Sequence, residues 1–99
     1  MNIYYLLIEA RTCSNNNESK QFGGAYVNCW VNAKNQQSAI NAAKQYIDSE
    51  GWETINIEEV YLSSRDYYDD EPDLQSCFDL ACKNGIGAIF NTWPLEEDA

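Results

Sequence analysis

Histidine is absent from this chain of 99 residues, and lysine and arginine number six against sixteen aspartate and glutamate residues. Histidine is the commonest general base in enzymes, and without it neither a Ser-His-Asp triad nor a Cys-His pair can form within the chain. A phosphate-binding loop is missing as well, because Gly85 and Gly87 lack a third glycine and precede a predicted strand. These absences predict that the protein is not an enzyme.

The scarcity of basic residues also limits the partners that the protein can bind. The six basic residues form no cluster along the chain. They are Arg11, Lys20, Lys34, Lys44, Arg65 and Lys83. Because the formal net charge is −10, we expect no direct binding to nucleic acid and no adhesion to an anionic membrane. The same charge favours a basic protein as partner, since opposite charges steer association. The alternative is that the acidity only keeps the protein soluble.

Long apolar segments are absent, which bears on the location of the protein. The most apolar stretch, Ile3 to Ile8, is far shorter than a membrane-spanning helix and leads directly into Glu9 and Arg11. It also lacks the basic region that opens a secretory signal peptide. We therefore expect no membrane association and a cytoplasmic location.

The cysteines include no CxxC pair: they are Cys13, Cys29, Cys77 and Cys82. Without histidine a zinc ion would need all of their thiolates, yet Cys77 and Cys82 are five positions apart on a predicted helix and point in different directions. We expect no metal and no cofactor. Cys29 and Cys77 occupy apolar positions of periodic segments, which is typical of small buried hydrophobic residues. A disulfide from Cys13 in an oxidising compartment is the alternative.

The chain does have the apolar and aromatic side chains that one core needs, at 44% and 13% of its residues. A disordered chain would contain few aromatic residues. The length and composition predict a single domain over residues 1–99, in which the acidic residues 95–99 form a frayed tail.

The first half of the chain predicts a hairpin. Residues 2–12 begin with a nearly continuous apolar run, which is typical of a central strand with both faces at least partly covered. Residues 25–33 alternate strictly between two sets of side chains, as a strand with two different faces does. A polar loop over residues 13–24 joins the two strands.

Two more strands are predicted further along the chain. Within residues 54–63, Ile55 and Ile57 share one face, but the later apolar residues fall on the opposite parity. A β-bulge near Glu58 and Glu59 would reconcile the two. Residues 86–92 form a last, short strand.

Two helices are predicted between these strands. Asn35 is expected to cap the first, which buries an apolar face and ends before Gly51. Asp70 is expected to cap the second, which has Pro72 in its first turn and ends at Gly85.

The order β-β-α-β-α-β predicts an α+β fold, a two-layer sandwich of about four strands with both helices packed on one sheet face. The opposite face would then be open. On the strand parity it carries Tyr5, Leu7, Glu9, Tyr26, Trp30 and Tyr61. Tyrosine and tryptophan are frequent in binding hot spots, so this face is a candidate binding surface. A cover of loop residues, or a homodimer seam, is the alternative.

The second candidate surface is the acidic segment, residues 65–73, with five carboxylates in eight positions beside two tyrosines. Its oxygen atoms suit calcium, but the spacing is not that of an EF-hand loop. A solvated loop at a helix start is the simplest interpretation, and binding of a basic protein is the second. For partner binding we select Tyr67, Tyr68, Asp69, Asp70, Glu71 and Asp73, with Tyr26 and Trp30 as an aromatic second patch.

Together these observations predict a non-enzymatic acidic interaction domain that binds a basic partner, such as an inhibitor or an immunity-type protein. Two alternatives stay open. One is a homo-oligomeric accessory protein that uses the open sheet face. The other is a small ligand-binding or enzymatic domain with a pocket between sheet and helices.

Overall fold

The computed structural model describes residues 2–12 and 22–94. Cys13, the tail over 95–99 and most of the predicted loop over 13–24 lie outside these ranges. The predicted α+β class and the order β-β-α-β-α-β are confirmed. The elements are β1 Ile3–Thr12, β2 Phe22–Asn32, α1 Gln36–Ser49, β3 Trp52–Leu62, the 3-10 helix η2 Arg65–Tyr68, α2 Pro72–Asn84 and β4 Ile86–Pro94.

All described strands belong to one antiparallel sheet with the order β3-β1-β2-β4. The predicted pairing of the first two strands is confirmed, with Ile3 opposite Asn32 and Ala10 opposite Ala25. β2 begins at Phe22, inside the predicted loop, because its first residues pair with the end of β4. β1 is a central strand, as its apolar run predicts.

Two irregularities shape β3. The predicted bulge is confirmed, since the pairing with β1 shifts between Leu7 and Ile8 and leaves Glu58 without an opposite residue. A second shift, between Glu9 and Ala10, leaves Ile55 without an opposite residue as well. Ile55 is therefore 47% exposed, while Ile57 packs against the core. The expectation that these two isoleucines share a face was wrong, because the second bulge reverses the parity between them.

The limits of α1 follow the sequence signals. The side-chain oxygen of Asn35 accepts a hydrogen bond from the backbone N–H of Ser38 at 2.8 Å, which confirms the predicted cap. Gly51 follows the helix with φ 88°, a left-handed conformation that glycine adopts without a steric cost.

The start of α2 differs from the prediction. Its N-cap is Glu71 and not Asp70, and the Glu71 side chain makes no capping bond. The reason is that η2 and the turn after it occupy the preceding residues, with the N–H of Glu71 bonded to the carbonyl of Tyr68 at 2.9 Å. Pro72 in the first turn and the end at Gly85 are confirmed.

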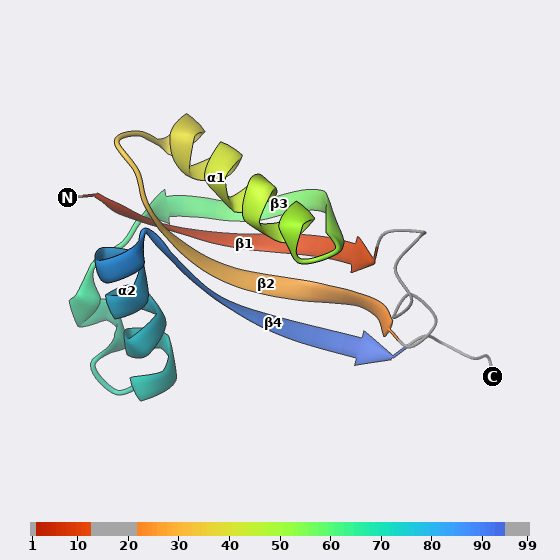
Figure 1. Ribbon diagram of the computed structural model, residues 1–99. Helices are drawn as coiled ribbons and strands as arrows, with labels where there is room; N and C mark the ends of the chain where they lie inside the picture. Colours follow the sequence, from red (N-terminus) through yellow and green to blue (C-terminus); the bar gives the residue numbers. More distant parts are fainter. Residues whose placement is uncertain (1, 13–21, 95–99) are drawn as a thin grey trace.

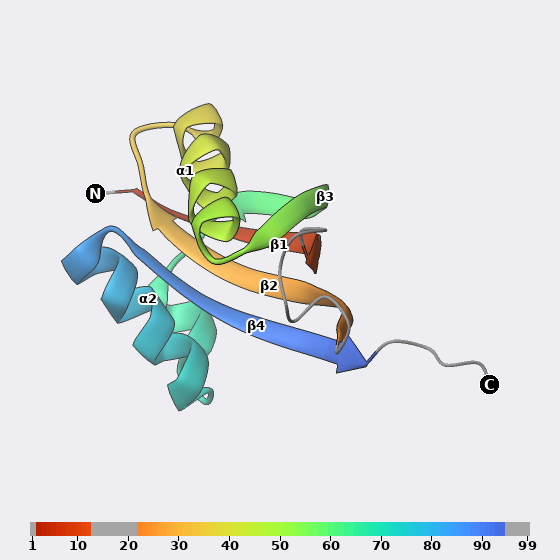
Figure 2. The ribbon, with the colours of Figure 1, turned by 45° about the vertical axis from the view of Figure 1, so that its right-hand side comes forward.

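The two helices pack on opposite faces of the sheet, which corrects the expectation that they share one (Figure 1). Turning the molecule keeps α1 and α2 on different sides (Figure 2). The α1 face buries side chains that include Leu6, Val27 and Cys29. The α2 face buries Trp30 and Ile3 against α2 and η2.

Two features explain this arrangement. Consecutive residues of β2, from Cys29 to Val31, are all buried, so both faces of the strand need a cover at this point. Gly87 of β4 then lets α2 approach, because a Cβ atom there would lie only 2.3 Å from the carbonyl oxygen of Cys77. α2 covers only one end of its face (Figure 1), and toward the other end Tyr26 and Asn91 are exposed within the part of the chain that the structure describes.

Candidate functional site

The acidic segment, residues 65–73, lies on the α2 side of the sheet, where η2 leads into the first turn of α2. Tyr67 is 62% exposed. The carboxylates selected from the sequence are all exposed: Asp69, Asp70, Glu71 and Asp73, together with Asp66. The structure thus brings one exposed tyrosine and five exposed carboxylates together on η2, the turn after it and the first turn of α2.

Tyr68 is not part of this exposed surface, although the sequence analysis selected it for partner binding. Its side chain is 6% exposed and points inward. The ring lies between Trp30 and Phe78, with centroid separations of 5.6 Å and 6.2 Å. A partner that binds the folded surface cannot contact a buried ring, so we assign Tyr68 a structural role.

Trp30 requires the same correction, because it is fully buried under α2 and η2. Its indole N–H donates a hydrogen bond to the Tyr68 hydroxyl at 2.9 Å. The Tyr68 hydroxyl and the Ser63 hydroxyl lie 2.7 Å apart and share a second bond. Buried polar groups need such partners, and here they attach η2 to the sheet. Trp30 therefore holds the acidic segment in place through its buried contact with Tyr68.

A pair of charged residues fixes the segment from its other side. Arg65 donates from Nε and Nη2 to the two carboxylate oxygens of Asp79, at 2.9 Å and 3.1 Å. This bidentate contact raises the pKa of Arg65 and holds the pKa of Asp79 below its usual value. Both side chains are exposed, so the gain in stability is small. The contact does bond the Arg65 guanidinium to α2, because Asp79 lies in that helix.

The uncovered end of the α2 face carries a polar and aromatic network across the strands. Asn28 donates to the Tyr5 hydroxyl at 2.7 Å, and Asn91 donates to the Asn28 side-chain oxygen at 2.6 Å. The ring of Tyr5 lies 5.2 Å from that of Tyr61, which is half exposed. Burial raises the pKa of Tyr5 above its ordinary value, against the lowering effect of the bond from Asn28. The ring of Tyr5 also lies 5.2 Å from that of Trp30, which contacts Tyr68, so a series of ring contacts links Tyr61 to η2.

Tyr26, the last residue selected from the sequence, lies elsewhere on this face. It is exposed, and it is paired across the sheet with Glu9 and Asn91. Four positions of extended strand, about 13 Å, separate it from Trp30. The predicted aromatic patch of Tyr26 and Trp30 therefore does not exist as one surface. Tyr61 is the aromatic residue near the acidic segment, close enough for Tyr67 and Tyr68 to contribute to its raised pKa after burial, the main cause. Asp79 helps to hold the segment in place, and no local sequence signal indicates it.

Cysteine chemistry is suppressed in the core. Burial raises the pKa of the Cys29 thiol to about 12, and burial also raises the pKa of Cys77. A thiol must lose its proton to act as a nucleophile or as a metal ligand. The interpretation of Cys29 and Cys77 as buried hydrophobic residues is confirmed by their burial. Among residues 2–12 and 22–94, no group of three or more Cys, Asp or Glu side chains is arranged to hold a metal ion.

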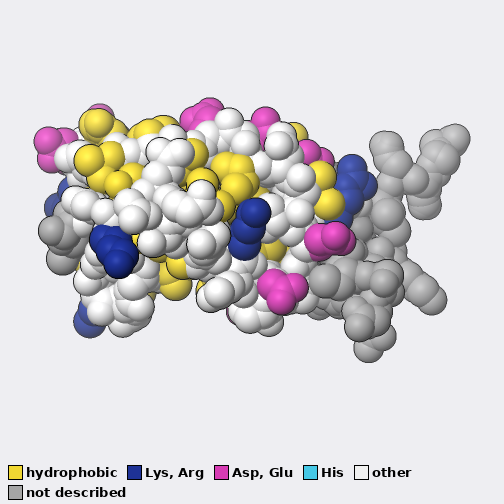
Figure 3. Space-filling view, turned by 90° about the horizontal axis from the view of Figure 1, so that it is seen from above, with side chains coloured by type: hydrophobic (Ala, Val, Ile, Leu, Met, Phe, Trp, Pro, Cys, Tyr) yellow, Lys and Arg dark blue, Asp and Glu magenta, His cyan; other side chains and the backbone are white. Residues whose placement is uncertain are grey.

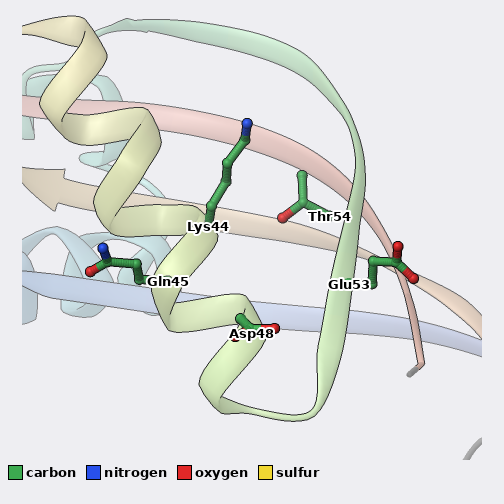
Figure 4. A pocket seen from close by; sticks show the side chains of 5 residues that line it. All are labelled: Lys44, Gln45, Asp48, Glu53 and Thr54. Atoms are coloured by element: carbon green, nitrogen blue, oxygen red, sulfur yellow. The ribbon is translucent and has the colours of Figure 1, made fainter. Parts of the chain in front are cut away.

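The hollow between α1 and β3 has a volume of about 370 Å³ (Figure 4). It is lined by Lys44, Gln45, Asp48, Glu53 and Thr54. In Figure 4 Gln45 and Glu53 point away from each other instead of toward a common centre. Ligand pockets contain a few polar groups that converge on the ligand, so this arrangement does not favour the pocket alternative.

Thr54 leads to a prediction of stability. Its hydroxyl oxygen is enclosed by protein and has no hydrogen-bond partner. An unsatisfied buried polar atom is unfavourable, so Thr54→Val should raise the free energy of unfolding by about 1 kcal/mol. Urea denaturation measures the change, and Thr92→Val at an exposed position of β4 is the matched control, expected to change little. A loss of stability in Thr54→Val would show that the hydroxyl makes a favourable bond.

Charge on the α1 side of the molecule is mixed. Figure 3 views this side, and it shows basic and acidic side chains scattered among hydrophobic ones. Among the described residues, Figure 3 shows no concentration of acidic side chains on this side that is comparable to the five carboxylates of the acidic segment. No helix in the described part of the chain is long and apolar enough to cross a membrane.

Comparison with known protein families, with curated proteins and with solved structures finds no match for this chain.

Proposed function

We propose that the protein is a non-enzymatic interaction domain that binds a basic protein through the acidic segment, with Tyr67 and Tyr61 as its aromatic contacts. An inhibitor or an immunity-type protein against a basic toxin is the kind of activity that this surface suits. The observation that supports the proposal most directly is the set of five exposed carboxylates within residues 66–73, in a chain of net charge −10.

The charge of the segment is available to a partner. Arg65, its only basic residue, is bonded to Asp79 of α2. Within the described residues, the other salt bridge joins Arg11 to Glu9 on β1, away from η2. A basic partner would meet several carboxylates together, which speeds association and selects against acidic or neutral competitors.

The segment is also held in place before binding. Tyr68 attaches it to Trp30 inside the molecule, and Arg65 attaches it to Asp79 on the surface. A surface that is already ordered loses less conformational entropy on binding than a mobile loop. Tyr67 can then present its ring to a lysine or arginine side chain in a cation–π contact.

We further propose that the protein works in the cytoplasm and does not bind nucleic acid. Cys29, Cys77 and Cys82 are free thiols, which fits a reducing compartment such as the cytoplasm. Nucleic acid is not part of the proposal, because a phosphate backbone would be repelled by the carboxylates that define the surface.

The test compares three baits in affinity capture from a lysate of the source cells, at low and at high salt. The baits are the unmodified protein, the variant Asp69→Asn/Asp70→Asn/Glu71→Gln, and a control variant, Asp48→Asn/Glu50→Gln/Glu53→Gln. The control carries the same change of net charge on exposed residues at the end of α1 and the start of β3.

We expect a basic protein that the unmodified bait and the control retain at low salt, and that the first variant loses. Its association rate, measured by surface plasmon resonance, should fall about tenfold or more in the first variant, and salt should weaken the complex. If the first variant and the control behave alike, the acidic segment is not the binding surface. If no protein is captured, the proposed function fails.

A further inference from the structure

The two edges of the sheet differ in how they are protected. β3 and β4 are the edge strands. β3 carries two bulges and the charged residues Glu53, Glu58 and Glu59, which are common devices against edge-to-edge pairing. β4 has no charged residue between Ile86 and Pro94. Its pairing with β2 is regular from Gly24 and Trp93 to Val31 and Ile86.

The free hydrogen-bonding groups of β4 can be assigned from one bond. The N–H of Asn32 donates to the carbonyl of Gly85 at 2.9 Å, so this carbonyl points toward β2, and the N–H of Ile86 in the same peptide plane points away from β2. Along an antiparallel strand these directions alternate. The N–H and C=O groups that point away from the sheet therefore belong to Ile86, Ala88, Phe90 and Thr92. Within the part of the chain that the structure describes, no other strand pairs with this edge.

We propose that β4 pairs antiparallel with β4 of a second copy of this chain, which joins the two sheets into one across a two-fold axis at Ile89. This register is the one in which all four outward residues find a counterpart. Ile86 then lies opposite Thr92 of the second copy, and Ala88 lies opposite Phe90. Such a contact is symmetric and closed, as in most homodimers.

Side-chain size supports a second copy over an unrelated strand. In this register a small residue faces a large one on each side of the sheet: Ala88 faces Phe90, and Gly87 faces Asn91. Cross-strand neighbours of this kind pack without collision. Leu80 of α2 lies beside Gly87, 3.1 Å from the position of a Cβ atom there, and it is 43% exposed. A strand paired with β4 would cover this apolar side chain.

Charge supports the same choice of surface. Two chains of net charge −10 repel each other over most of their surfaces. An uncharged edge is where such a chain can approach its own copy at the lowest electrostatic cost. The dimer should consequently become tighter as salt screens the repulsion, whereas the proposed complex with a basic partner becomes weaker. The inference uses residues outside the acidic segment, so each proposal can fail without the other.

The first experiment is sedimentation of the full chain from micromolar to millimolar concentration, at low and at high salt. We expect a reversible dimer that tightens at high salt. Ala88→Pro removes one outward N–H in each copy, and a proline is tolerated at an edge position where the N–H faces solvent. It should raise the dissociation constant of the dimer by about tenfold or more.

Leu62→Pro is the matched control on β3. The N–H of Ser63 donates to Ile3 of β1, so the N–H of Leu62 points outward by the same alternation, and its side chain is exposed. This variant should dimerise like the unmodified protein. A chain that stays monomeric at all concentrations overturns the proposal, and so does equal weakening by both prolines.

A second measurement does not depend on any variant. Amide hydrogen exchange of the unmodified protein should show increased protection of Ile86, Ala88, Phe90 and Thr92 at high concentration. The amide of Leu62 should not change. If a dimer forms and the four β4 amides stay unprotected, the two copies meet elsewhere and the proposed interface is wrong. This result decides the question even if Ala88→Pro does not fold.

Discussion

Gly87→Ala is expected to lower the free energy of unfolding by about 3 kcal/mol, although it adds a single methyl group. The added Cβ atom would lie 2.3 Å from the carbonyl oxygen of Cys77 and 3.1 Å from its carbonyl carbon. These are backbone atoms of α2, which no side-chain rotation can move away. The helix must lift from β4, and its contacts with the sheet loosen together.

Gly85→Ala is the matched control, two positions earlier in the same connection. There a Cβ atom would meet nothing within 4 Å, but the residue has φ +99°. Gly85→Ala should therefore lower the free energy of unfolding by about 1 kcal/mol, because only the backbone conformation becomes unfavourable. Urea denaturation of both variants separates the two causes. If the two variants lose the same free energy of unfolding, α2 is not in close contact with β4 at Gly87.

Trp30→Ala is expected to cost about 3–5 kcal/mol of folding free energy, the other large effect in this protein. Trp30 is the largest fully buried side chain, and its ring lies 5.2 Å from Tyr5 and 5.6 Å from Tyr68. Its removal leaves a cavity between the sheet and α2. The Tyr68 hydroxyl also loses the indole N–H as its hydrogen-bond donor.

Tyr68→Phe separates the hydrogen bond from the packing. It keeps the ring and leaves the Trp30 N–H buried without its acceptor, which should cost about 1–3 kcal/mol. Chemical denaturation measures both variants, and near-ultraviolet circular dichroism reports the packing of the aromatic cluster. If Trp30→Ala costs less than Tyr68→Phe, the cavity closes by local collapse, and the assignment of Trp30 as the anchor of η2 is wrong.

Local signals in the sequence were enough to predict the strands and the two α-helices in their order, but not the 3-10 helix η2. Asn35 and Gly51 mark the ends of α1 by hydrogen bonding and backbone conformation, which depend on few neighbours. The change of apolar parity in β3 indicated the bulge at Glu58 because side chains alternate strictly along a strand. The second bulge had no such signal, since Ile55 is apolar and yet exposed.

The placement of the helices was beyond such local signals. Parity divides the residues of a strand between two faces, but it does not say which face a later helix covers. The continuous apolar start of β1 indicated a cover on both faces, but the close approach of α2 at Gly87 is visible only in the structure. Only the contacts of Trp30 with η2 and α2 join these observations. The expectation of one open aromatic face failed for this reason.

The candidate site was predicted in part. The carboxylates of the acidic segment are exposed as charge requires. The two adjacent tyrosines could not be told apart from sequence, because the 3-10 turn of η2 sends Tyr67 outward and Tyr68 inward. Asp79 is fourteen positions from Arg65, a separation that only the packing of η2 on α2 makes short.

The strand order has a consequence for the rate of folding. β1 and β2 are adjacent both in the chain and in the sheet, so their pairing closes one loop. β4 must find β2 after two helices and β3 have intervened, and Asn91 meets Tyr26 across 65 positions of chain. Closing long loops early is entropically costly, so the hairpin is a favoured nucleus and β4 docks last. With these distant strand pairings, we expect this α+β domain to fold more slowly than small helical bundles do.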